Sequence, residues 1–129
     1  MGSARRNIHV NCTPDVAWSL VGDPSRLHEW FPMESCRVEG DKRWVTLPSG
    51  LVLEEDIVLH DHDLRRFQYE IVNNFLITKH LSTLDVVDDG HGHSVIIYST
   101  DVKPDVFALV IGGAAGEALE NARRILEGS

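Results

Sequence analysis

Cysteine, basic side chains and long hydrophobic runs are all scarce in this sequence. Its 129 residues include two cysteines, Cys12 and Cys36, which are too few and too far apart for a disulfide framework. No CxxC pair offers a zinc or redox site, and we expect both thiols to be small buried side chains. Lysine and arginine number 12 against 20 aspartates and glutamates, a net charge of −8. This balance argues against nucleic acid or an anionic membrane as a partner, because both require a basic surface.

No apolar stretch approaches the roughly 20 residues that a membrane-spanning helix needs. The N-terminus also lacks the apolar segment of a signal peptide, so we expect a cytoplasmic protein without membrane insertion. With 43% hydrophobic residues, the chain is too apolar to be disordered. No repeat or Pro/Gly-rich linker divides it, which predicts one domain over residues 1–129, with residues 1–4 disordered or left over from cloning.

The first quarter of the chain combines a strand with two short helices. Residues 7–12 alternate apolar and polar side chains, which is the period of a half-buried strand. Thr13 can cap a helix that begins at Pro14 and stops near Gly22. A second short helical segment is expected over residues 24–30.

The remainder of the chain predicts a meander of strands and one closing helix. Turn signals separate the expected strands, which are Glu34–Glu39, Arg43–Thr46, Leu51–Leu59, Arg66–Val72, Ile77–Val87 and Ser94–Val102. From Pro104 to Leu126 the apolar residues follow a helical period, which predicts one long amphipathic helix. A strongly curved antiparallel sheet can wrap such a helix, so we predict an α+β fold with about seven strands around it.

Several motifs resemble a known superfamily. Residues 13–23 (TPDVAWSLVGD), followed by Trp30-Phe31-Pro32, resemble the opening of the START-like (SRPBCC) polyketide cyclase/dehydrase and lipid-transport proteins. Bacterial members often carry a strand glutamate, an aspartate six residues later, an arginine four after that and a tyrosine four later; here these are Glu55, Asp61, Arg65 and Tyr69. His80 and Tyr98 stand where bulkier aromatic residues are frequent, which implies a more polar pocket than usual.

The resemblance, over about residues 7–126, implies a helix-grip fold with a deep cavity between the curved sheet and the C-terminal helix. Across the superfamily this cavity holds lipids, sterols, polyketides and other apolar molecules, although the fold does not fix one chemistry. We therefore expect a protein that binds a small apolar or aromatic ligand, such as a lipid or polyketide-like compound, without a cofactor. The alternative is a polyketide cyclase or dehydratase that uses acid and base groups in the cavity. The oligomeric state, monomer or homodimer, is open.

Glu55, Tyr69 and His80 are the candidate catalytic residues. Glu55 shares a strand face with Leu53 and Ile57, so an inward row would bury its carboxylate and raise its pKa. The following hairpin would bring Tyr69 beside Ile57 and Glu55. His80 carries the side chain most easily poised for proton transfer near neutral pH. The alternatives are that Glu55 pairs with an arginine or reaches solvent, that Tyr69 only packs in the core, and that His80 is structural.

The expected cavity lining combines these residues with apolar side chains from the helices and strands. Pairing of the last two strands through the turn at residues 88–93 would place His80 opposite Tyr98. The full predicted lining is Trp18, Leu27, Trp30, Leu53, Ile57, Phe67, Tyr69, His80, Tyr98, Phe107, Val110 and Ile111.

Two histidine pairs and three glycines allow both a structural and a functional interpretation. His60-Asp61-His62 and His91-Gly92-His93 resemble metal-ligand pairs, and both turns fall at the same end of an up-and-down sheet. Solvent-exposed turns are the interpretation we favour, so no metal site is predicted. The closing helix contains Gly112, Gly113 and Gly116, which indicate close packing or a kink, or else a helix that gates the cavity.

Overall fold

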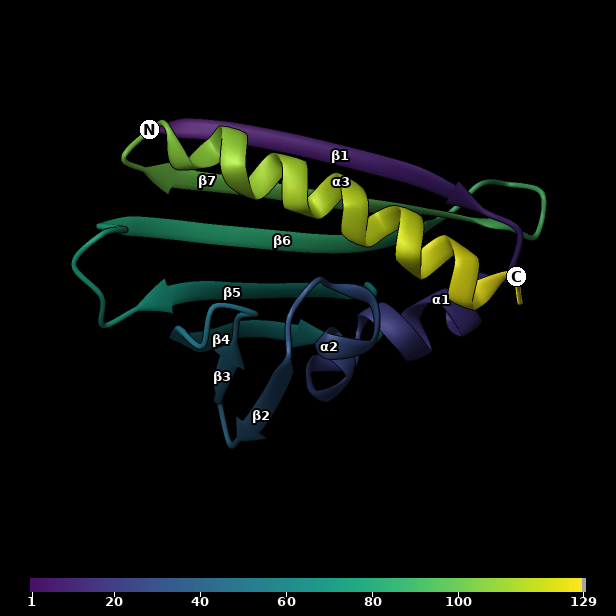
Figure 1. The fold of residues 1–129 in the computed structure, drawn as a ribbon. Coiled ribbons are helices and arrows are strands. Elements are labelled where there is room, and N and C mark those ends of the chain that lie inside the picture. Colours follow the sequence, from purple (N-terminus) through teal and green to yellow (C-terminus); the bar gives the residue numbers. More distant parts are fainter. Residues whose placement is uncertain (129) are drawn as a thin grey trace.

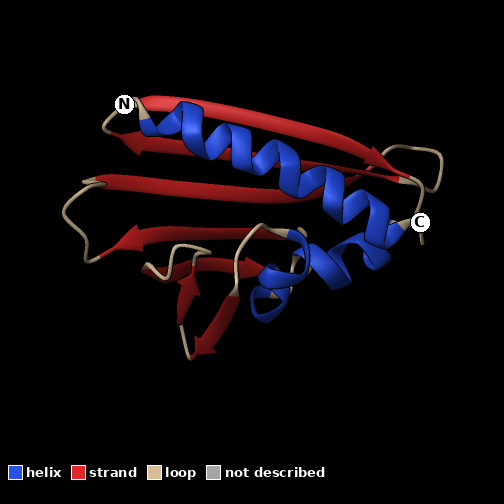
Figure 2. Ribbon diagram, in the orientation of Figure 1, coloured by secondary structure: helices blue, strands red, loops and turns tan. Residues whose placement is uncertain are grey.

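Seven antiparallel strands form a single sheet in the order β1-β7-β6-β5-β4-β3-β2 (Figures 1 and 2). This computed structural model describes residues 1–128. The elements in chain order are β1 (Gly2–Val10), α1 (Pro14–Val21), the 3-10 helix η1 (Pro24–Arg26), α2 (Leu27–Trp30), β2 (Ser35–Glu39), β3 (Lys42–Thr46), β4 (Val52–Asp61), β5 (Arg66–Val72), β6 (Lys79–Asp88), β7 (Ser94–Lys103) and α3 (Phe107–Leu126). The predicted α+β helix-grip fold is therefore confirmed, including the short helices after the first strand and the long closing helix.

The connection between the two edges of the sheet places the short helices. Strand β1 pairs with β7 at one edge and β2 pairs with β3 at the other, so the chain crosses between the edges through α1, η1 and α2. Helix α3 lies across one face of the sheet and packs mainly against β1 and β7 (Figure 1). The result is two layers, with the space between α3 and the strands β3 to β6 left for side chains or a ligand.

Strand β1 begins earlier than the sequence pattern predicts. Residues 2–4 are not disordered, because they pair with residues 100–102 of β7. The inward side of this segment is covered by α3, where a Cβ on Gly112 would lie 3.0 Å from the Cβ of Ala4. The alternation signal is weak here because small and basic residues, not aliphatic ones, face the helix. At the other strands, the predicted and observed bounds differ by at most two residues.

Helix α1 has the capping pattern that the sequence indicates. The Thr13 hydroxyl accepts a hydrogen bond from the Val16 N–H at 3.3 Å, and Pro14 occupies the first turn. At the other end, a Cβ on Gly22 would lie 2.3 Å from the Trp18 ring. Only glycine allows this ring to pack against the end of its own helix.

One part of helix α3 packs in the hydrophobic core, and another part borders the open space between the helix and the sheet. From the middle of the helix onward, Ala115, Ala118, Leu119 and Ala122 are buried against strand residues and α1. Of the three glycines, Gly112 fits the close-packing interpretation, since it contacts β1, whereas the Cβ position of Gly113 is open to solvent. Among residues 1–128, no helix has the length and hydropathy needed to cross a lipid bilayer.

Candidate ligand pocket and its buried polar cluster

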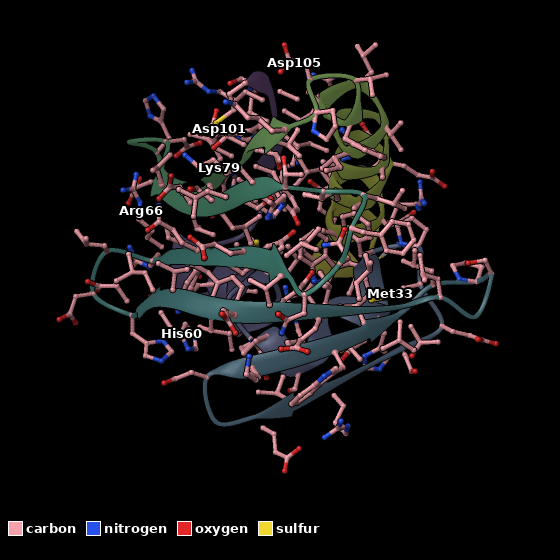
Figure 3. All side chains as sticks on the ribbon, turned by 90° about the vertical axis from the view of Figure 1, so that its left-hand side faces the viewer. Met33, His60, Arg66, Lys79, Asp101 and Asp105 are labelled. Carbon is pink, nitrogen blue, oxygen red and sulfur yellow. The ribbon has the colours of Figure 1, made fainter. Side chains whose placement is uncertain are left out.

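A pocket of about 350 Å³ lies between the sheet and the N-terminal half of α3. Strands β3 to β6 form its floor, and its walls come from α2, the loops before β4 and before β6, and the first turns of α3. Met33, which contributes to the wall, lies on the helix side of the sheet, whereas Arg66 and Lys79 lie on the outer side (Figure 3). The lining consists almost entirely of carbon, so the pocket suits an apolar molecule.

The mouth of the pocket is an exposed apolar rim. Phe75 in the β5–β6 loop is 91% exposed, and Val110 on α3 is 65% exposed, yet both line the pocket. Leu51 and Leu76 add to the same rim. Exposed apolar groups around a concavity are typical of an opening through which a ligand enters. The apolar run at residues 75–77 is the sequence signal that could have identified this rim, although we assigned only Ile77 there, to a strand.

The structure places seven of the twelve predicted lining residues in this pocket. They are Leu27, Leu53, Tyr69, His80, Phe107, Val110 and Ile111. The other five lie outside its lining: Trp18, Trp30, Ile57, Phe67 and Tyr98. Except for Ile57, which packs against the core, these are buried core residues around α1 and α2. The alternation of side chains along the strands predicts which residues face inward. It does not predict which end of the sheet is covered by the short helices and which end borders the pocket.

Glu55 is buried in the floor of the pocket and forms an ion pair with Arg43. The Nε of Arg43 donates to the Glu55 Oε1 at 2.6 Å, and the two residues are 2% and 4% exposed. They face each other across the β3–β4 pair, where Arg43 shares the inward side of β3 with Val45. The Nη1 of Arg43 also donates to the Pro24 carbonyl at 3.2 Å. Of the alternatives considered for Glu55, the structure shows pairing with an arginine.

Two tyrosines extend the polar cluster. The guanidinium of Arg43 lies 4.8 Å from the centre of the Tyr69 ring, and the hydroxyls of Tyr69 and Tyr98 share a hydrogen bond. Burial raises the pKa of Glu55, and the adjacent guanidinium opposes this rise. Burial also raises the pKa of both tyrosines, so their hydroxyls stay neutral near pH 7. Arg43 was absent from our predicted site because a charged residue on the inward side of a short strand contradicts the usual pattern.

His80 lies in the pocket floor with both ring nitrogens engaged. Its Nδ1 accepts a hydrogen bond from the Ile71 N–H at 2.9 Å, which leaves the proton on Nε2. The Nε2 lies 2.9 Å from the Ser82 hydroxyl, which in turn lies 2.8 Å from that of Thr100. Burial lowers the pKa of His80 from 6.5 to about 4. The ring is therefore neutral near pH 7, with no free nitrogen directed at a ligand.

One predicted strand pairing is right and one is wrong. Ile57 lies opposite Tyr69, as predicted for the hairpin between β4 and β5, and Glu55, which lies opposite Ile71, is the diagonal neighbour of Tyr69. His80, however, lies opposite Val102, not Tyr98. Since the pair Asp88↔Ser94 closes the β6–β7 hairpin, residues equally far from the turn are matched, and Tyr98 falls opposite Leu84.

Asn74 supplies a polar group at the mouth of the pocket. Its Oδ1 accepts hydrogen bonds from the N–H groups of Leu76 and Ile77, at 3.0 and 2.7 Å, which fixes the orientation of the amide. The Nδ2 is buried and, within the described part of the chain, has no hydrogen-bond partner. A buried N–H donor without a partner is costly, so this group favours a ligand with an acceptor oxygen.

The two histidine turns do not combine into a metal site. The His62 Nδ1 accepts a hydrogen bond from the Trp18 indole N–H at 2.9 Å, and the His60 Nε2 lies 2.7 Å from the Gly22 carbonyl. Both rings thus pack on α1. Over residues 1–128, no group of three potential metal ligands joins this turn to residues 91–93.

Comparison with known proteins gives the family. The sequence profile of the polyketide cyclase/dehydrase and lipid transport family matches residues 1–127. The chain belongs to this family. No curated protein sequence matches it.

Solved structures with the same fold include both uncharacterised and biosynthetic proteins. XoxI from Bacillus cereus is 23% identical, with a TM-score of 0.91 over 98% of this chain and 96% of that one. The di-domain ARO/CYC BexL from the BE-7585A biosynthetic pathway is 13% identical, with a TM-score of 0.81 over 98% of this chain and 47% of that one. A norcoclaurine synthase from Thalictrum flavum, in complex with a transition-state analogue, is 19% identical, with a TM-score of 0.75 over 98% and 94%. At these identities the likeness shows the polyketide cyclase/dehydrase fold alone.

Proposed function

We propose that this protein binds a small apolar or aromatic molecule, such as a lipid or polyketide-like compound, in the pocket beneath α3. The observation that carries the proposal is a carbon-lined pocket of about 350 Å³ whose apolar rim opens to solvent. This volume lies within the range of small-molecule sites, roughly 300–1,000 Å³. Membership of a family that includes lipid-transport proteins supports the same class of ligand.

The hydrogen bonding of the three candidate catalytic residues favours binding over catalysis. Glu55 is paired with Arg43, Tyr69 with Tyr98, and both nitrogens of His80 are engaged by protein groups. A general base needs a free lone pair within reach of the substrate. Glu55 nevertheless lines the pocket, so a cyclase or dehydratase with Glu55 as its acid or base is the second candidate.

Ligand capture is tested first with a library. Native mass spectrometry and displacement of a fluorescent apolar dye, with lipids and aromatic polyketide-like compounds, should reveal one ligand per chain. Turnover of bound compounds, followed by mass change, separates the two candidates: a modified product that disappears in Glu55→Gln supports the enzyme. Absence of any binder across the library contradicts both.

Filling the pocket should abolish binding without changing the fold. Ala114 is half-buried on α3 and lines the pocket, so the indole of Ala114→Trp would occupy much of the ligand volume. We expect dye affinity to fall at least tenfold. The matched control is Leu109→Trp on the same helix, because Leu109 is 78% exposed and outside the lining. Equal affinity of the two variants would show that the dye binds elsewhere.

The free amide of Asn74 should select ligands with an acceptor oxygen. Asn74→Asp keeps the oxygen that caps the loop but removes the N–H donor. We expect it to weaken the binding of 2-acetylnaphthalene about fivefold relative to that of 2-ethylnaphthalene, because one hydrogen bond contributes about 1 kcal/mol. Asn7→Asp, on the exposed side of β1, adds the same charge away from the pocket as the control. An unchanged ratio of the two affinities would mean that the amide does not contact the ligand.

A further inference from the structure

Three potential metal ligands form a row on the outer face of the sheet, one on the edge strand β1 and two in the turn between β6 and β7. Asp89 and His93 follow β6 and precede β7, and they flank the hairpin just beyond the Asp88↔Ser94 pair. His9 on β1 lies opposite Val95 of β7, so His93, two residues away on the same face, is its diagonal neighbour. The inward neighbours Ile8, Val10 and Ser94 are buried, so the row points to solvent.

The ligand atoms of this row lie close enough to share one ion. One ligand atom from each of His9, Asp89 and His93 lies within 4.8 Å of the other two, and the His9 Nε2 is 2.8 Å from the Asp89 Oδ2. Ligands at about 2.0–2.2 Å from a zinc ion are themselves separated by roughly 3–4 Å, so small rotations of exposed side chains suffice. The side chain of His9 is 50% exposed, which leaves it free to rotate and accessible to an ion.

The Asp89 carboxylate is already oriented for this task. Its Oδ1 accepts hydrogen bonds from the N–H groups of His91 and His93, at 2.7 and 3.0 Å, while Oδ2 is directed to His9. The hydrogen bond from His9, and then those from the backbone, hold the pKa of Asp89 well below its usual range. Such outer contacts fix a carboxylate ligand before the ion arrives.

We propose that His9, Asp89 and His93 form a surface site for a divalent transition-metal ion. Zinc is the ion with which we would test it. Two imidazoles and one carboxylate suit zinc and the ions that resemble it, and water completes the coordination. The site lies at the end of the sheet that holds the β6–β7 hairpin, whereas the ligand pocket adjoins the β5–β6 loop at the other end (Figure 1). It is therefore independent of the proposed ligand binding.

An ion at this site would join the edge strand β1 to the β6–β7 hairpin. The unfolded chain does not hold residues 9, 89 and 93 together, so binding to the folded state alone raises its stability. Thermal unfolding should thus shift to higher temperature as the zinc concentration rises, and chelation should reverse the shift.

The test uses the full chain purified without a histidine tag. Calorimetric titration with zinc should give one ion per chain, and the His9→Asn and His93→Asn variants should bind at least tenfold more weakly. The matched control is His91→Asn, which removes an exposed histidine from the same turn but outside the row. In zinc titrations followed by NMR, the ring signals of His9 and His93 should shift together.

Three results would overturn the proposal. The wild-type chain shows no zinc binding at micromolar protein and ion concentrations; or His9→Asn and His93→Asn bind as tightly as wild type; or His91→Asn loses as much affinity as they do, which would indicate only nonspecific histidine contacts. Circular dichroism of each variant establishes that a loss of binding does not come from a loss of fold.

Discussion

Arg43→Met is expected to lower the free energy of unfolding by about 3–5 kcal/mol, because it leaves the Glu55 carboxylate buried without its counterion. Glu55→Leu should lower the free energy of unfolding by a similar amount, because it leaves the Arg43 guanidinium buried without its counterion. A domain of this size is stabilised by roughly 5–15 kcal/mol in total, so either variant removes a large fraction. Urea unfolding at pH 7 measures both.

The double variant Arg43→Met/Glu55→Leu separates the cost of an unpaired charge from the worth of the pair. Replacing both partners by apolar groups of similar volume removes two buried charges at once, and is often neutral or stabilising. We expect the double variant to lie within about 2 kcal/mol of wild type, well short of the sum of the single changes. The remaining loss comes from the Arg43 contacts with Pro24 and the Tyr69 ring.

Lys42 provides the matched control on the outward side of the same strand. It pairs with Glu54 and Asp56 at 2.8 and 2.6 Å, but these groups are partly exposed. Lys42→Met should therefore change stability far less than Arg43→Met. If the two variants destabilise equally, or if the double variant loses the full sum, the ion pair does not have the strong coupling that its burial implies.

Alternation along β4 was enough to predict that Glu55 faces inward, but not what meets it there. The pairing with Arg43 depends on the register of β3 with β4, which the turn at residues 47–51 sets. The same limit applies to the last hairpin. The turn was placed correctly, yet only the observed register shows that His80 lies opposite Val102. Spacing gives the face of a residue, whereas its partner depends on pairing across distant segments.

The division of the interior into core and pocket could not be predicted from the sequence. Trp30 at the end of α2 and Phe107 at the start of α3 are both apolar, but Trp30 is packed in the core and Phe107 lines the pocket. What decides between them is that α1 and α2 cover only one end of the sheet (Figure 1). The packing of these helices is a tertiary property that no local pattern records.

His80 should make the protein acid-sensitive between pH 6.5 and about 4. Burial lowers its pKa to about 4. A proton on Nδ1 would also break the hydrogen bond that this nitrogen accepts from the Ile71 N–H. In this pH range the unfolded chain binds one more proton at this residue than the folded chain does. The contribution of His80 to the free energy of unfolding is therefore fully present above pH 6.5. As the pH is lowered, it decreases by about 1.4 kcal/mol per pH unit, and the loss approaches about 3 kcal/mol near pH 4.

The comparison with His80→Gln isolates this contribution from all other titrating groups. Glutamine keeps a polar side chain beside Ile71 and Ser82 but does not titrate, so the variant starts less stable at pH 7 and loses less between pH 6.5 and 4. His91→Gln, which removes an exposed histidine, should retain the wild-type slope. The ring signals of His80 in NMR should stay constant down to about pH 5. A ring that titrates near 6.5, or equal slopes for wild type and His80→Gln, would mean that the buried hydrogen bonds do not hold this histidine neutral.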